Sequence, residues 1–118
     1  MKYTIYSFLF AFLLIGNVNA EVYIWECKYH NGDNIYGIYK LDLSESKVGT
    51  LYPREYDKLK NNINNWEKLN WTPMVLFNYD KDNNKLFYDN FSYDLNNLKY
   101  YRKFSNETFT HNCNILNK

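Results

Sequence analysis

This chain of 118 residues has no large excess of either positive or negative charge. Lysine and arginine number 14, and aspartate and glutamate number 13, which gives a formal net charge of +1. Nucleic acids and anionic membranes bind proteins through clustered positive charge. The basic residues here are scattered, and the set nearest to a cluster, Lys99, Arg102 and Lys103, fits the solvated face of a strand. We therefore expect no nucleic-acid partner.

Long hydrophobic runs are lacking after the N-terminus. Residues 5–15 are apolar, follow Lys2 and precede a small-residue cleavage site at Ala20, which is typical of a secretory signal peptide. This run is shorter than the roughly 20 residues that a membrane-spanning helix needs. We predict a signal peptide at 1–20 and a single domain at 21–118, which is secreted or periplasmic and has no membrane span after cleavage.

Cysteine and histidine are scarce, with two residues of each type. Cysteine-based metal sites need closely spaced cysteines or several histidines, whereas Cys27 and Cys113 lie near the two ends of the predicted domain. In an oxidising compartment such an isolated pair predicts one disulfide. We expect neither a metal nor any other cofactor.

Recognisable catalytic motifs are also lacking. The sequence has no Gly-x-Ser-x-Gly elbow, and most of its carboxylates lie where aspartate favours turns. We therefore predict that the protein is not an enzyme. The alternative is a small secreted hydrolase or a metal-binding protein that uses His30, Asp33 and His111, because the strand register proposed below brings the two histidines to one end of the sheet.

Strand patterns are what the chain has in abundance. Residues 22–29 alternate, with aromatic residues and Cys27 on one face, which is the period of a β-strand. Asn31-Gly32 between two apolar runs predicts a hairpin that returns through residues 35–43. Gly37 in the return strand indicates a bulge or a close approach of the backbone.

The rest of the chain continues this pattern. Residues 74–104 are short apolar and aromatic runs separated by Asp, Asn and Lys, and residues 107–115 alternate again. The sequence therefore predicts a mainly β fold, an antiparallel meander of about 7–8 strands that is curled or closed into a barrel.

The predicted disulfide fixes the register between the first and last strands. If the number of strands is even and these two strands are neighbours, they run antiparallel, with Cys27 opposite Cys113. The flanking pairs are then Trp25 with Ile115 and Tyr29 with His111. Closure of this kind removes the exposed edges that invite aggregation.

Residues 53–70 do not follow the strand pattern. Tyr56, Leu59, Ile63 and Trp66 recur at helical spacing, and the proline at the start suits a first helical turn. Paired asparagines within the segment have poor helix propensity. We expect one short amphipathic helix over the sheet, or an irregular crossover with a short strand.

Aromatic residues are unusually frequent, with 13 Tyr, 8 Phe and 3 Trp. Where two aromatic residues are adjacent in a strand, one of them points away from the core. The candidate binding residues are Trp71, Tyr88, Tyr100 and Tyr101. We predict a non-catalytic binding module that presents these rings to a glycan, a peptidoglycan fragment or a protein, as an inhibitor does.

The cysteine framework is similar to that of a known family. Trp25-Glu26-Cys27 in the first strand and Asn112-Cys113 in the last resemble the bacterial periplasmic inhibitors of C-type lysozyme. The resemblance implies a small, disulfide-closed β domain. Those inhibitors insert a central Ser-Gly loop into the lysozyme cleft, and this sequence contains no Ser-Gly, so the resemblance does not carry the inhibitory function.

Overall fold

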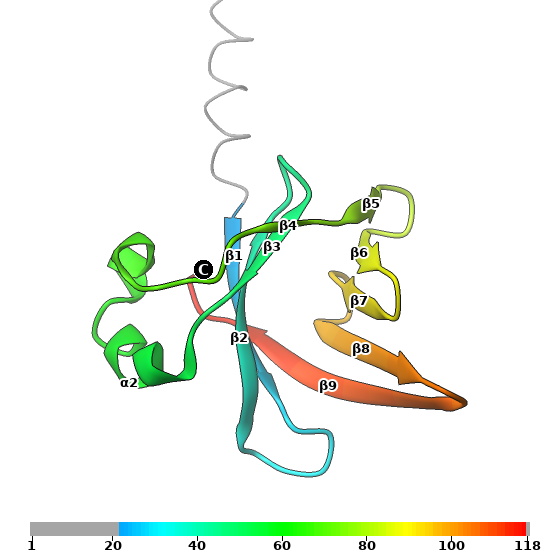
Figure 1. Cartoon of the computed structure of the whole chain (residues 1–118), viewed down its shortest axis with the longest axis horizontal. Helices are drawn as coiled ribbons and strands as arrows, with labels where there is room; N and C mark the ends of the chain where they lie inside the picture. Colours follow the sequence, from blue (N-terminus) through cyan, green and yellow to red (C-terminus); the bar gives the residue numbers. More distant parts are fainter. Residues whose placement is uncertain (1–21, 118) are drawn as a thin grey trace, which may run out of the picture.

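The computed structural model describes residues 22–117, and the predicted signal peptide at 1–20 lies outside the described residues. Within 22–117, nine antiparallel strands form one sheet in the order β4-β3-β2-β1-β9-β8-β7-β6-β5 (Figure 1). The strands are β1 (Val22–Lys28), β2 (Ile35–Asp42), β3 (Lys47–Thr50), β4 (Val75–Leu76), β5 (Asn78–Asp80), β6 (Lys85–Tyr88), β7 (Phe91–Asp94), β8 (Lys99–Phe104) and β9 (Glu107–Ile115). The predicted mainly β, barrel-like meander is confirmed.

The two edges of the sheet are joined by a single residue. β4 and β5 lie at opposite ends of the strand order, yet only Phe77 separates them in the chain. The Phe77 N–H donates a hydrogen bond of 2.7 Å to the carbonyl oxygen of Ser46, just before β3. β4 and β5 therefore form one pass of chain from edge to edge, which nearly closes the barrel (Figure 1). Counting them as one pass leaves an even number of passes, so β9 runs antiparallel to β1.

A disulfide secures the contact between the first and last strands. Cys27 is bonded to Cys113, and Trp25 lies opposite Ile115, both as predicted. The predicted pairing of Tyr29 with His111 is wrong, because the ladder between β1 and β9 ends at the disulfide. The reason is a bulge: the register of β1 on β2 shifts after Cys27, and the hairpin turns away from β9.

Aromatic side chains fill the barrel. The rings of Tyr93 and Tyr100 stack with their centroids 4.6 Å apart, and the Tyr39 ring contacts both, at 5.3 and 5.2 Å. Burial raises the pKa of each of these three phenols, to about 12 for Tyr100, so all three stay neutral. The buried residues of this core are Trp25, Cys27, Tyr39, Leu41, Val48, Leu86, Tyr93, Tyr100 and Cys113.

A second, smaller core lies on the outer face of β1 and β2. The crossover that covers it consists of η1 (Pro53–Glu55), α2 (Tyr56–Leu59) and η2 (Ile63–Lys68). The predicted apolar residues do pack there, on Ile24 and Ile38. They do not lie on one helix, because Asn62 and Asn65 have φ angles of −133° and −126°, outside the helical range. No helix within residues 22–117 is long and apolar enough to cross a membrane.

Gly37 lies beside the predicted bulge, where the register of β1 on β2 shifts after Cys27, and it supplies a test of the barrel packing. A Cβ at Gly37 would come within 2.5 Å of the Tyr39 hydroxyl oxygen and 2.7 Å of Cζ in the same ring. That ring is buried and packs against the rings of Tyr93 and Tyr100. We expect Gly37→Ala to lower the free energy of unfolding by about 1–3 kcal/mol, measured by chemical denaturation.

The matched control for Gly37 is Gly32, in the hairpin turn. No atom lies within 4 Å of a Cβ built there, so Gly32→Ala should change the free energy of unfolding by less than about 0.5 kcal/mol. Equal effects of the two substitutions would contradict the packing of Tyr39 over Gly37.

Candidate functional site

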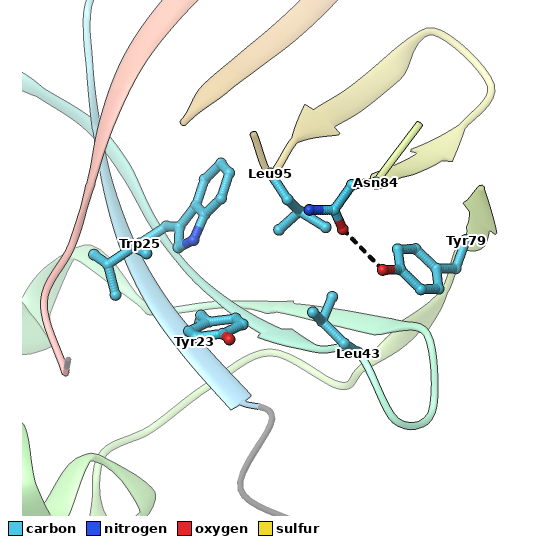
Figure 2. Close-up of a pocket in the computed structure, with 7 residues that line it drawn as sticks. Tyr23, Trp25, Leu43, Tyr79, Asn84 and Leu95 are labelled. Atoms are coloured by element: carbon cyan, nitrogen blue, oxygen red, sulfur yellow. Dashed lines mark hydrogen bonds between the residues drawn. The ribbon is translucent and has the colours of Figure 1, made fainter. Parts of the chain in front are cut away.

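A pocket of about 300 Å³ opens at the end of the barrel where β1 begins. Figure 2 shows its side chains converging on one space from several strands and turns. The residues that line it are Tyr23, Trp25, Leu43, Tyr79, Asn84, Leu95 and Ile115. Six of these seven side chains are aromatic or aliphatic, and the two tyrosines add hydroxyl groups to the wall.

Strand alternation positions the inner wall of the pocket. Tyr23 and Trp25 are two residues apart on β1 and share the face that points into the barrel. Ile115 comes from β9 and lies directly opposite Trp25 in the ladder. Tyr79 enters from β5 on the far side of the nearly closed sheet. The pocket therefore exists only because both halves of the barrel meet.

Three turns with the same conformation form the rim of the pocket. Asp42, Asp80 and Asp94 end β2, β5 and β7, and each carboxylate accepts hydrogen bonds from the backbone of the following turn. The donors are the N–H groups of Glu45, Asn83, Asn96 and Asn97. Four residues after each aspartate φ is positive, at Ser46 (56°), Asn84 (54°) and Leu98 (54°). These turns hold the rim residues Leu43, Asn84 and Leu95.

Trp25 carries the unusual feature of the pocket. Its side chain is fully buried, and no described residue accepts a hydrogen bond from its indole Nε1–H. The indole nitrogen faces the space between Tyr23 and Leu95 (Figure 2). Buried N–H groups are almost always paired, and an unpaired one costs about 1–3 kcal/mol. This unpaired donor therefore lies behind the pocket wall, and an acceptor reaches it only when the side chains that cover it move.

A second polar group lies at the rim. The Tyr79 hydroxyl donates a 2.8 Å hydrogen bond to the Asn84 side-chain oxygen, and the Asn84 amide nitrogen donates to Asn96 at 3.0 Å. Because its proton is used in this bond, the Tyr79 hydroxyl presents lone pairs to a ligand. The lining contains no carboxylate, histidine or thiol. The side chains that line it can make hydrogen bonds and apolar contacts.

The structure does not bring the four predicted binding residues together. Tyr100 is only 5% exposed and belongs to the barrel core, so its prediction as part of an exposed platform is wrong. Trp71 packs beside Trp66 in the outer core, on the other face of the sheet. Tyr88 is 47% exposed and contacts Phe77. Tyr101 lies on the face of β8 opposite to Tyr100 and is partly buried.

The alternative hypothesis of a metal site rested on His30, Asp33 and His111. The structure does bring the two histidine rings near each other, with centroids 6.2 Å apart. Both nitrogens of the buried His111 ring are already hydrogen-bonded, to Lys28 and to Arg102 at 2.8 Å each. Among the described residues, no group of three His, Cys, Asp or Glu side chains could hold a metal ion.

Sequence reasoning placed Trp25 on an inward face but did not identify it as a site residue. The signal was its register: Trp25, at the centre of β1, lies opposite Ile115, the last residue of β9, so beyond this pair β9 no longer covers the inner face of β1. Compared with models of known protein families, with curated proteins and with solved structures, the chain matches none. The geometry of the site is therefore what bears on function.

Proposed function

We propose that this protein is a non-catalytic binding module that holds one N-acetylated sugar ring, as found in a peptidoglycan fragment or another glycan, in the pocket at the start of β1. The observation that supports this most is the unpaired Nε1–H of Trp25 behind the wall of the pocket. The carbonyl oxygen of an acetamido group is a hydrogen-bond acceptor that would satisfy it.

The remaining walls fit the other parts of such a ligand. A sugar ring has apolar C–H faces and a polar rim, and the pocket pairs the rings of Tyr23 and Tyr79 with aliphatic Leu43 and Leu95. The Tyr79 hydroxyl can accept a hydrogen bond from a sugar hydroxyl. A volume of about 300 Å³ suits a single sugar ring.

The disulfide is consistent with the proposed location. Disulfides form and persist outside the reducing cytosol, in secreted and periplasmic proteins. Cys27–Cys113 is present, and no free cysteine is found among the described residues. We therefore propose that the protein meets its glycan in the periplasm or outside the cell.

The test is a calorimetric titration of the mature protein with N-acetylglucosamine. We expect saturable binding, and we expect glucose, which lacks the acetamido group, to bind more weakly. Trp25→Phe keeps an aromatic ring and removes the donor, so the affinity should fall about 5–10-fold, the worth of one buried hydrogen bond. Its thermal unfolding, measured alongside, shows whether the variant is folded.

The matched control is Trp71→Phe. Trp71 Nε1 donates to the Trp66 carbonyl oxygen at 2.8 Å, away from the pocket, so its loss should leave the affinity unchanged. Absence of binding by the wild-type protein to both N-acetylglucosamine and a muramyl dipeptide would contradict the proposal. So would equal affinities of the wild type and folded Trp25→Phe.

A further inference from the structure

The barrel end opposite the pocket has a different construction. β9 pairs with β8 from Glu107 to Asn112, but it pairs with β1 only from Cys113 onward. Beyond the disulfide the hairpins β1–β2 and β8–β9 therefore separate (Figure 1). The side chain of Arg102, from β8, lies in this opening, next to His111 and Tyr36.

Arg102 is held on several sides. Its guanidinium carbon lies 4.5 Å from the centre of the Tyr36 ring, 5.0 Å from that of Phe109 and 5.7 Å from that of Phe104. Its Nε–H donates a 2.8 Å hydrogen bond to Nε2 of His111. Ring contacts and this bond together fix the direction of the planar guanidinium.

His111 can accept the hydrogen bond from Arg102 only when its ring is neutral. Because arginine has no acceptor, Nε2 of His111 accepts, and its proton must lie on Nδ1, which donates to the Lys28 carbonyl oxygen at 2.8 Å. Burial lowers the pKa of His111, which keeps the ring neutral. His111 thus orients Arg102 without neutralising its charge.

The two terminal nitrogens of Arg102 have no acidic partner within the described part of the chain. The ion pairs found there are Lys47 with Glu45 and Lys58 with Glu55, and Arg102 donates only through Nε. The side chain is partly buried, so water screens its charge incompletely. Phe104, 43% exposed, adds an apolar wall beside it. An oriented, unpaired guanidinium is what binds a planar oxyanion in two-bond geometry.

We propose that Arg102 forms a second binding site, at the end of the barrel opposite the pocket, for a carboxylate carried next to an apolar group. The two terminal N–H groups bind the carboxylate oxygens, and the apolar group packs on the exposed ring of Phe104. Free aromatic acids and the C-terminal residue of a peptide share this chemistry. The site is independent of the sugar pocket, since the two lie at opposite ends of the same strands.

The test uses the mature protein and NMR titration, with the Arg102 Nε–H signal as the reporter. N-acetyl-phenylalanine represents a peptide C-terminus, benzoate represents a free aromatic acid, and N-acetyl-phenylalaninamide lacks the carboxylate. We expect millimolar or tighter binding of at least one acid and none of the amide. Preference for N-acetyl-phenylalanine indicates a peptide terminus, and preference for benzoate indicates a small acid.

Three variants distinguish two-bond binding by the Arg102 guanidinium from simple attraction to a positive charge. Arg102→Lys keeps the charge but loses the two-bond geometry, so the affinity should fall about tenfold. Phe104→Ala removes the exposed apolar wall beside the guanidinium, and it should weaken binding several-fold. Lys103→Gln removes a neighbouring, exposed charge and should have almost no effect.

Three results would overturn the proposal: no binding of either acid at millimolar concentration, equal binding of acid and amide, or unchanged affinity of both Arg102→Lys and Phe104→Ala. Saturating the pocket with N-acetylglucosamine should leave acid binding unchanged. Because the two ligands and their reporters differ, failure of one site is distinguishable from failure of the other.

Discussion

Replacing both cysteines, as Cys27→Ala with Cys113→Ala, is expected to lower the free energy of unfolding by about 3–5 kcal/mol. The disulfide closes a loop across 86 positions of sequence, and in the chain-entropy model a loop of that size is worth about 4–5 kcal/mol. In a domain of this size such a loss corresponds to a fall in the melting temperature of roughly 12 °C or more. Thermal and denaturant unfolding of the two proteins measure it.

The disulfide has a local role as well. β1 pairs with β2 over seven positions but with β9 over only three, Trp25 to Cys27, so the disulfide reinforces a short seam between the two halves of the barrel. In the double variant we expect faster hydrogen exchange at this seam than within the β1–β2 ladder. A loss of less than about 1 kcal/mol, or uniform exchange, would contradict this role.

Truncating Tyr93 to alanine is expected to cost about 3–5 kcal/mol of the free energy of unfolding. The Tyr93 ring is 2% exposed, and its centroid lies within 6 Å of those of Trp25, Tyr39, Phe77 and Tyr100. Because these rings come from five strand passes, removing the central one leaves a cavity that cannot easily collapse. Denaturant unfolding measures the change.

Tyr101 gives the matched control for Tyr93. It comes from the neighbouring strand, where it pairs with Ser92 and Thr110, and it is partly exposed on the outer face. Tyr101→Ala removes the same number of atoms and should cost no more than about 1 kcal/mol. Similar losses for the two variants would mean that the barrel interior is not the main core.

Much of the fold could be predicted because each cysteine lies in a stretch whose residues alternate between the two faces of a strand. Once Cys27 and Cys113 are opposite, period two places Trp25 and Ile115 on the same inward face, and the structure agrees. The crossover was predicted less well, because its apolar spacing describes which residues face the sheet and not whether one helix carries them. These apolar residues lie on two short helices, α2 and η2, and both helices pack on Ile24 and Ile38.

The sequence pattern could not predict the closure of the barrel at Phe77 or the residues that line the pocket. Adjacent Tyr100 and Tyr101 must point to opposite faces, but only the pairing of Tyr100 with His111 decides which one points inward. The pocket depends on turns from both halves of the barrel that meet around the Trp25 indole. No local pattern in the sequence records which acceptors a folded chain leaves near a particular N–H group.

The most direct test of the proposed function is the indole region of a ¹⁵N–¹H spectrum during titration with N-acetylglucosamine. The Trp25 Nε1–H has no partner among the described residues, whereas the Trp71 Nε1–H is hydrogen-bonded to Trp66. We expect the Trp25 signal to move downfield to saturation as it gains an acceptor, while the Trp71 signal stays in place. A Trp25 signal that does not move at saturating sugar, or equal movement of both signals, would contradict the account.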